Sequence, residues 1–354
     1  MALDYRKQKI LQAIVDDYIE TAEPVASKAL VARHDFQLSS ATVRNEMADL
    51  EELGYLEQPH TSAGRIPSDK GYREYVDSLM HVDTLTPQEE NVIRHRITES
   101  FQEISGLLRN ASSALAENTG YVSLALTPRL RKSYLTQLKM LMIEPGKVLV
   151  VVVLSAGVVK DKIARVPDFL SAEQLYTVSK AVESGLCGRP LEEISLITVT
   201  SAVKGTNIPD MLLNQILYET YTAIKQADNL EVYMDGTNQM LCYPEFHDNS
   251  RARNLFDTLT KDGMIAGYVT EVAENQPTPK FMIRIGQEIQ LEGLKDCSFV
   301  TTTYHVGDRI AGNIGVIGPK RMDYAKVISQ INFVRTTMDE QLKILKNTDG
   351  GQEE

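Results

Sequence analysis

The chain has 354 residues, a formal net charge of −11 and 24% charged residues, with a pI near 5.2. This length allows two or three domains with a sizeable core, and the acidic balance argues against a role at a membrane surface. The longest apolar run, residues 148–156, is too short to span a bilayer, and the N-terminus lacks the pattern of a signal peptide. We therefore expect a cytoplasmic protein with no membrane contact.

The first 80 residues predict three helices followed by a hairpin. Apolar side chains at helical spacing between Ile10 and Ile19 form the stripe of a first helix, and Pro24 marks the start of a second. In residues 39–53, an apolar residue recurs at the spacing of a helix with one buried face. These residues are Val43, Met47, Leu50 and Leu53. Helix, turn, helix and wing is an arrangement that lays one helix in a DNA groove.

The opposite face of helix 39–53 has the side chains that base recognition requires. It carries Ala41, Asn45, Ala48 and Glu52, flanked by Thr42 and Arg44. Alanines let the backbone approach a duplex closely. Asparagine and arginine, here Asn45 and Arg44, can each form two hydrogen bonds with one base edge, that of adenine and that of guanine respectively. Ser39 or Ser40 can cap the helix start, where free N–H groups can meet a phosphate.

The hairpin after Gly54 supplies a second group of candidate contacts. Its expected tip holds Thr61, Ser62, Gly64 and Arg65, with His60 beside it. A wing arginine can enter the minor groove or hold a phosphate, and hydroxyls can donate to phosphate oxygens. The candidate DNA-binding residues are therefore Ser40, Thr42, Arg44, Asn45, His60, Thr61, Ser62 and Arg65.

The charge of this segment leaves an alternative open. Residues 1–80 hold 9 basic against 14 acidic side chains, a net charge of −5. No overall attraction therefore holds the segment on DNA, and binding must come from a local cluster and from dimerisation. Two helices joined by a turn also occur in domains that never touch DNA, so a scaffold that uses the same fold for protein contacts remains a second hypothesis.

Two further helices are expected before the first long strands. Residues 67–80 predict a helix, and a long helix is expected over residues 87–118. Thr86 is a good N-cap with Pro87 in the first helical position, and Glu89 completes a capping box.

After residue 120 the apolar pattern becomes that of strands. Strands are predicted at residues 121–126, 138–144 and 148–154, and Pro145-Gly146 makes a hairpin turn between the last two. The strand at 148–154 is apolar on both faces and should be central. Later strands are predicted at residues 281–285, 298–305 and 309–317, with a turn around residues 306–308.

The middle of the chain fits an insertion into this sheet. Helices are expected at residues 171–184, capped by Ser171 with Gln174, and at 209–226, with intervening strands at 196–200 and 231–235. The predicted class is α+β, a central antiparallel sheet flanked by helices. A C-terminal tail over residues 341–354 is expected to be disordered.

No set of residues indicates catalysis, a cofactor or a metal site. Cys187, Cys242 and Cys297 are widely spaced, and the six histidines show no ligand spacing. Gly312, Gly315 and Gly318 suggest a phosphate loop, but that loop ends in Gly-Lys-Ser/Thr, whereas here Gly318 precedes proline and lysine. We therefore expect no enzyme, no cofactor and no metal.

Three runs of sequence resemble the HrcA family of heat-inducible transcription repressors. They are EPVASKAL, SSATVRNEMADLEELGYLEQPHTSAGRIPSDKGYREYVD and CSFVTTTYHVGDRIAGNIGVIGPKRMDYAKVI. The chain departs from the family pattern at Lys320, where Thr is usual, and at Gln287-Glu288-Ile289, where Glu-Asn is common.

The resemblance implies a domain plan and a set of partners. It implies a winged helix-turn-helix over residues 1–80, a linker helix over 81–119, and a GAF-like sheet domain over 120–157 and 248–340, with a dimerisation domain inserted at 158–247. It further implies a homodimer on an inverted-repeat operator of the CIRCE type, kept active by the GroE chaperonin. Because GAF-like domains often hold small ligands, a regulator that binds a small-molecule effector is the alternative.

Overall fold

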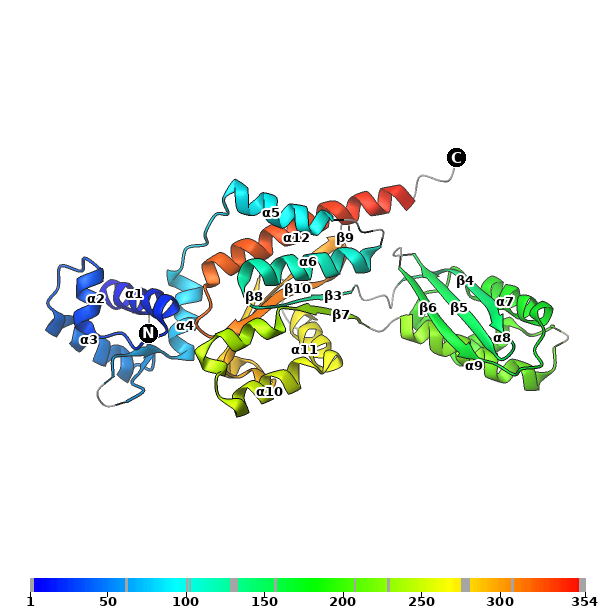
Figure 1. Ribbon diagram of the computed structural model, residues 1–354, viewed down its shortest axis with the longest axis horizontal. Helices are drawn as coiled ribbons and strands as arrows, with labels where there is room; N and C mark the ends of the chain where they lie inside the picture. The colour runs from blue at the N-terminus through cyan, green and yellow to red at the C-terminus, as the bar shows by residue number, and fades with distance from the viewer. Residues whose placement is uncertain are drawn as a thin grey trace.

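The computed structural model describes residues 3–60, 63–99, 101, 103–127, 133–155, 158–206, 208–227, 230–274, 281–306 and 309–349. It is a mixed helix and sheet structure whose sheets are antiparallel, as predicted. Figure 1 shows three bodies along the long axis. We call them the head (residues 3–80), the sheet body (residues 81–127 and 230–349) and the outer lobe (residues 133–227). Within the described residues, no helix is long and apolar enough to cross a membrane.

The head contains three helices, a short two-stranded sheet and a fourth helix. These are α1 (Tyr5–Thr21), α2 (Ser27–Arg33), α3 (Ser40–Glu52), β1 (Leu56–Glu57), β2 (Ile66–Pro67) and α4 (Asp69–Glu74), continued by the π-helix η1 (Tyr75–Leu79). The α3 helix begins as predicted because the Ser39 side chain accepts the Thr42 N–H at 3.1 Å. The apolar stripe of α3 is buried as far as Leu50, whereas Leu53 is exposed. The α2 helix begins at Ser27, three residues after the start expected at Pro24.

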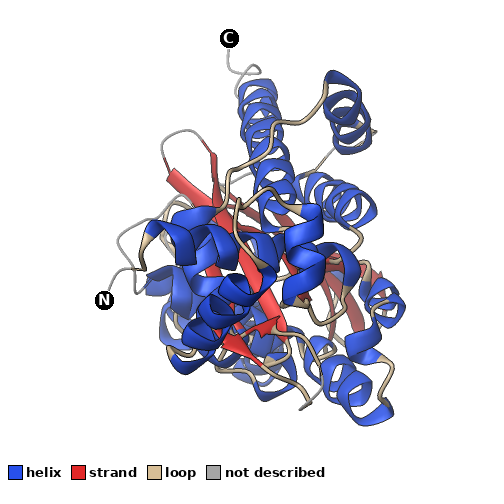
Figure 2. Cartoon of the chain, turned by 90° about the vertical axis from the view of Figure 1, so that its left-hand side faces the viewer, coloured by secondary structure: helices blue, strands red, loops and turns tan. Residues whose placement is uncertain are grey.

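The sheet body has a five-stranded antiparallel sheet with helices on both faces. Its strands are β3 (Val122–Leu126), β7 (Val232–Asp235), β8 (Met282–Ile285), β9 (Cys297–Val306) and β10 (Arg309–Pro319), in the order β7-β3-β10-β9-β8. One face packs against α6 (Ile104–Thr119) and α12 (Tyr324–Asp349), and α10 (Asn249–Leu259) and α11 (Asp262–Glu274) lie on the other. Seen from the head end, strands run through the centre with helices around them (Figure 2). Four 3-10 turns complete the sheet body: η3 (Thr237–Cys242), η4 (Pro244–Phe246), η5 (Gly286–Glu288) and η6 (Glu292–Leu294).

Two predictions for segments beside this sheet, one of a single helix and one of a disordered tail, are wrong. The single helix expected over residues 87–118 is two helices, α5 (Pro87–Thr98) and α6, which pack side by side. The Asn110 side chain closes the end of α5 by donating to the Glu99 carbonyl at 2.7 Å. At the C-terminus, α12 continues to Asp349, so the tail expected over residues 341–354 is helical up to there; residues 350–354 lie outside the described part.

The outer lobe is a three-stranded sheet with its own hydrophobic core. It contains β4 (Leu135–Glu144), β5 (Lys147–Leu154), β6 (Val159–Arg165), α7 (Ala172–Leu186), η2 (Leu191–Glu193), α8 (Leu196–Ala202) and α9 (Asp210–Ala227). The predicted hairpin at Pro145-Gly146 and the central position of β5 are confirmed. The strand expected at residues 196–200 is the helix α8, because Ser195 and Thr198 form a capping box.

The sheets do not follow the division expected between residues 157 and 158. The β4 and β5 strands pair with β6 in the outer lobe, so a boundary at residue 157 would cut the β5–β6 pairing. At the other end, β7 pairs with β3 in the sheet body, although residues 231–235 were expected to lie in the insert. The inserted body therefore runs from about residue 133 to residue 227.

Candidate nucleic-acid interface

The outer face of α3 presents one cation, one amide and one carboxylate, that of Glu52, to solvent. Ala41, Arg44, Asn45 and Ala48 are all exposed, as their helical phase predicts. Among the described residues, no hydrogen bond or ion pair engages the side chain of Arg44 or Asn45. These two side chains are thus available for base edges or phosphates, with small residues beside them.

Two acidic side chains of α3, Glu46 and Asp49, pair with cations of α1. Glu46 accepts from Arg6 at 3.2 Å and from Lys7 at 2.8 Å, and Lys7 also lies 3.1 Å from Asp49. The Lys7 and Glu46 side chains are only 17% and 13% exposed, and the bonds to Glu46 and Asp49 raise the pKa of Lys7. These pairs offset part of the repulsion that Glu46 and Asp49 would exert on a phosphate backbone, whereas Glu52 is exposed and has no ion pair among the described residues.

Arg65 lies at the base of the hairpin, not at its tip as predicted. Its backbone exchanges two hydrogen bonds of 2.9 Å with Val25, and β2 begins at the next residue. Its guanidinium donates to Glu51 of α3, with Nε 2.8 Å and Nη2 2.7 Å from one carboxylate oxygen. Gly64 makes this closure possible, since a Cβ there would lie 2.4 Å from the Val25 carbonyl. Arg65 thus ties the hairpin to α3 and to the segment just before α2.

The remaining predicted contacts lie at the start of α3 and in the hairpin. Ser40 is half-buried, and the Thr42 hydroxyl is 2.9 Å from that of Ser39. The first N–H groups of a helix have no partner within it, so the start of α3 offers donors beside these hydroxyls. His60 is exposed, and its carbonyl accepts from Ala63. The predicted contacts Thr61 and Ser62 lie outside the described residues.

The structure also shows functional partners that the sequence did not indicate. Arg6 and Lys7 pair with Glu46 of α3, and Glu51 of α3 pairs with Arg65 of the hairpin. Arg6 and Lys7 are about 40 positions away from Glu46 in sequence, so no local spacing relates them. Lys28 of α2 is exposed. Its position on the surface is equally compatible with a contact to phosphate and with a charge that only water surrounds.

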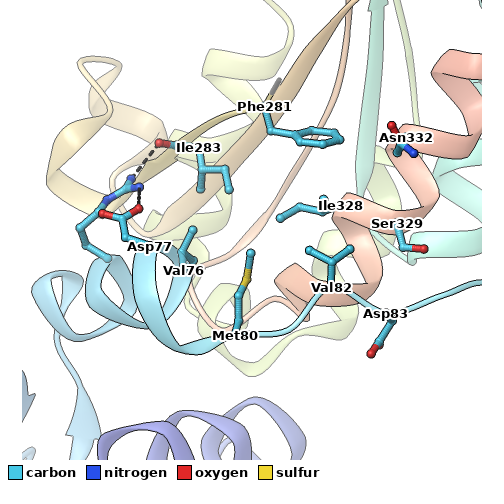
Figure 3. Close-up of a pocket in the computed structure, with 11 residues that line it drawn as sticks. Val76, Asp77, Met80, Val82, Asp83, Phe281, Ile283, Ile328, Ser329 and Asn332 are labelled. Atoms are coloured by element: carbon cyan, nitrogen blue, oxygen red, sulfur yellow. Dashed lines mark hydrogen bonds and ion pairs between the residues drawn. The ribbon is translucent and has the colours of Figure 1, made fainter. Parts of the chain in front are cut away.

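A cavity of about 630 Å³ lies between η1, β8 and α12 (Figure 3). Its lining is about equally apolar and polar, and the polar members are Arg73, Asp77, Asp83, Ser329 and Asn332. The apolar residues are Val76, Met80, Val82, Phe281, Ile283 and Ile328. Within the described chain, no group of three or more His, Cys, Asp or Glu residues could hold a metal ion. The glycines considered for a phosphate loop lie in β10, where a Cβ at Gly312 or Gly315 would meet backbone oxygens of neighbouring strands within 2.6 Å.

Comparisons with known proteins identify close relatives of nearly full length. Residues 105–328 match the family described as the HrcA protein C-terminal domain. The Heat-inducible transcription repressor HrcA of Ruminiclostridium cellulolyticum is 42% identical over 349 residues, which are 98% of this chain and 100% of that one. The protein of the same name from Acetivibrio thermocellus is 41% identical, covering 99% of each chain. A solved structure described as a hypothetical protein at 2.2 Å shares the fold, with a TM-score of 0.65 at 22% identity, over 97% of this chain and 100% of that chain.

Proposed function

The chain belongs to the HrcA family of heat-inducible transcription repressors, and we propose that it represses by placing α3 of each head of a homodimer in a major groove of an inverted-repeat operator. In this proposal the head is a winged helix-turn-helix and the sheet body is a GAF-like domain. Arg44 and Asn45 contact base edges, and Ser40, Thr42 and His60, with Thr61 and Ser62, meet the sugar-phosphate backbone.

The observation that carries this proposal is the charge arrangement around α3. The exposed side chains Arg44 and Asn45 are free of partners within the described residues, whereas Glu46 and Asp49 are paired with Arg6 and Lys7. The face carries Arg44 and Asn45 around Ala41 and Ala48, with Glu52 as its one exposed carboxylate near the C-terminal end of α3. Arginine and asparagine beside small residues suit contact with base edges in a major groove. We propose that Arg65 holds the wing against α3 through its ion pair with Glu51.

An apolar sheet face in the outer lobe supports the dimer. Leu141, Leu149 and Ile163 stand in one row across β4, β5 and β6, and Leu141 and Ile163 are 55% and 62% exposed. The other face of this sheet packs on α7 and α9. Because exposed apolar clusters of this kind mark interaction sites, we propose that a second copy of the chain covers this face.

The dimer test uses two substitutions of equal chemistry. Ile163→Asp should give a monomer in analytical ultracentrifugation and weaken operator binding. Ile197→Asp, on the exposed surface of α8, should remain a dimer. A dimeric Ile163→Asp variant would contradict the use of this face.

The operator, the target genes and the chaperonin come from the family resemblance. We propose a CIRCE-type operator upstream of chaperone genes, and a GroE chaperonin that keeps the repressor active until heat-damaged proteins occupy it. The test is a salt titration of binding to the inverted repeat and to a scrambled duplex, before and after mild heating, with and without chaperonin. Undiminished binding after heating without chaperonin would contradict the chaperonin's role. Absence of binding to any DNA at low salt, even with chaperonin, would favour a protein-interaction scaffold.

The cavity beside η1 favours a second candidate function. Its volume of about 630 Å³ and its mixed apolar and polar lining, which includes Arg73, suit a small organic ligand. We propose as the alternative that an effector bound there regulates the head. Stabilisation of the protein by metabolite fractions in a thermal-shift assay would support it, and loss of that shift in a Met80→Glu variant would locate the ligand.

A further inference from the structure

Two ion pairs join α4 of the head to the sheet body. Asp69 Oδ1 is 2.7 Å from Lys320 Nζ, in the turn after β10, and Asp69 Oδ2 accepts the Gln287 N–H at 2.9 Å. Four residues further along the chain, Arg73 Nε donates to Glu288 at 2.9 Å and Arg73 Nη2 donates to the Ile283 carbonyl at 2.8 Å. We call Asp69, Arg73, Glu288 and Lys320 the head latch.

The head latch depends on a specific backbone conformation at Gly286 and lies beside buried side chains, unlike an ion pair between isolated surface charges. Gly286 has φ +54°, and a Cβ at this position would lie 2.1 Å from the Asp69 carboxylate. Only glycine therefore lets this turn approach Asp69 so closely. Beside the latch, the buried rings of Tyr72 and Tyr324 lie 6.2 Å apart between their centroids. Polar and apolar contacts together hold the head against the sheet body at this point.

The latch fixes the direction of the head without covering its DNA-facing surface. Figure 1 shows α4 beside the sheet body, with α2 and α3 on the far side of the head. The covalent connection from η1 to α5 is residues 80–86, which form no helix or strand. Seven extended residues reach about 23 Å, roughly two-thirds of a turn of the DNA helix, which is about 34 Å. The connection alone thus could not keep two heads in phase with two half-sites.

We infer that the head latch positions the two heads of the dimer and so determines which half-site spacing the operator must have. This inference rests on the proposed function, because it requires a dimer whose heads bind DNA. The latch residues touch no DNA in this scheme. They act by limiting the orientations of the head, which raises the effective concentration of the second head once the first is bound.

The decisive variant is Lys320→Glu, which sets two carboxylates against each other at the latch. Lys320→Arg keeps the pair and is the conservative control. Lys326→Glu makes the same charge change at a partly exposed lysine that pairs with Glu89 inside the sheet body. Binding is measured by fluorescence anisotropy on operators whose spacer is changed in steps up to about half a turn, roughly 5 base pairs.

The wild-type protein and both controls should prefer one spacing sharply. Lys320→Glu should lose roughly tenfold or more of its affinity at that spacing and bind all spacings almost equally. A Lys320→Glu variant with the wild-type spacing profile would overturn the inference.

A second measurement is independent of DNA. Spin labels on cysteines introduced at Lys28 in the head and Lys295 in the sheet body, in a chain whose native cysteines are serine, report the head–body distance. Lys320→Glu should broaden this distance distribution, and an unchanged distribution would overturn the latch. If the distribution broadens while the wild-type protein binds no operator at any spacing, the proposed function fails, and the inference about half-site spacing fails with it.

Discussion

The substitution Glu51→Ala separates the two roles that Arg65 can have in DNA binding. Arg65 holds one Glu51 oxygen with two nitrogens, at 2.8 and 2.7 Å, and the two side chains are 20% and 34% exposed. Because Glu51 is about one-third exposed, water screens part of the attraction, and we expect a coupling of about 0.5–1 kcal/mol. That coupling corresponds to a factor of about 2–5 in an equilibrium constant.

If Arg65 anchors the hairpin, removing either Arg65 or Glu51 should displace the hairpin by the same amount. Glu51→Ala and Arg65→Ala should each weaken operator binding about 2–5-fold, and the double variant should be no weaker than either single variant. If Arg65 instead holds a phosphate, Glu51→Ala should free it and tighten binding, whereas Arg65→Ala should weaken binding. The two roles therefore predict opposite signs for Glu51→Ala.

The assay is an anisotropy titration at fixed salt with the four proteins of the double-mutant cycle, accompanied by chemical denaturation of each. Glu57→Ala removes an equal charge from the exposed side of β1 and measures the general effect of a lost carboxylate. Tighter binding by Glu51→Ala than by Glu57→Ala would refute the anchoring role.

Three further results are expected. Asn45→Ala should cost about 1–3 kcal/mol on the operator and nothing on a scrambled duplex; equal losses on both would assign the residue to the phosphate backbone. Gly64→Ala should destabilise the head by about 1–3 kcal/mol in urea denaturation, because its Cβ would lie 2.4 Å from the Val25 carbonyl; an unchanged midpoint would contradict this. Burial raises the pKa of Glu231, but bonds led by that from Lys160 outweigh burial and leave the pKa below its ordinary value of 4.5. The stability that Glu231 contributes is therefore full above that value and lost as pH falls through the folded-state pKa, so Glu231→Gln should lower the Tm at neutral pH and have less effect in acid.

Helix starts were predictable because their determinants are local. Ser39, Thr86 and Ser171 each cap the helix that the sequence places after them, and such bonds span only three residues. The hairpin at Pro145-Gly146 was predictable for the same reason. The exposed face of α3 followed from its helical phase alone.

Features that depend on distant parts of the chain could not be predicted in this way. The apolar spacing across residues 87–118 fits one long helix and also two helices folded side by side, because both bury Ile93, Ile97 and Leu108 on one core. Similarly, the apolar strand β5 shows that it is central but not in which sheet it lies. The β-branched residues of 196–200 favour a strand, and the cap at Ser195 outweighs them.

Positions that appeared only as departures from the family pattern gain a physical account. Lys320 and the segment beginning at Gln287 both contact α4 of the head, through Asp69 and Arg73. Neither their charge nor their spacing indicates this, since more than 200 residues separate the partners. Tertiary packing alone brings them together.

The head has few unpaired cations, and this bears on the proposed dimer and on the proposed role of the latch. Within residues 3–60 and 63–80, Lys28 and Arg44 are the two cationic side chains that no hydrogen bond, ion pair or ring contact engages. If both meet phosphates, two heads neutralise about four, and the logarithm of the affinity should fall with the logarithm of salt with a slope between about −3 and −4. One head alone should therefore bind weakly at physiological salt. In the proposed dimer, tight binding requires that the second head arrive already oriented. The proposed roles of the outer lobe's apolar face and of the latch are to supply the second copy and that orientation. A slope far steeper than −4 would mean that the ion pairs around α3 open on DNA and release Arg6 and Lys7 to the phosphates.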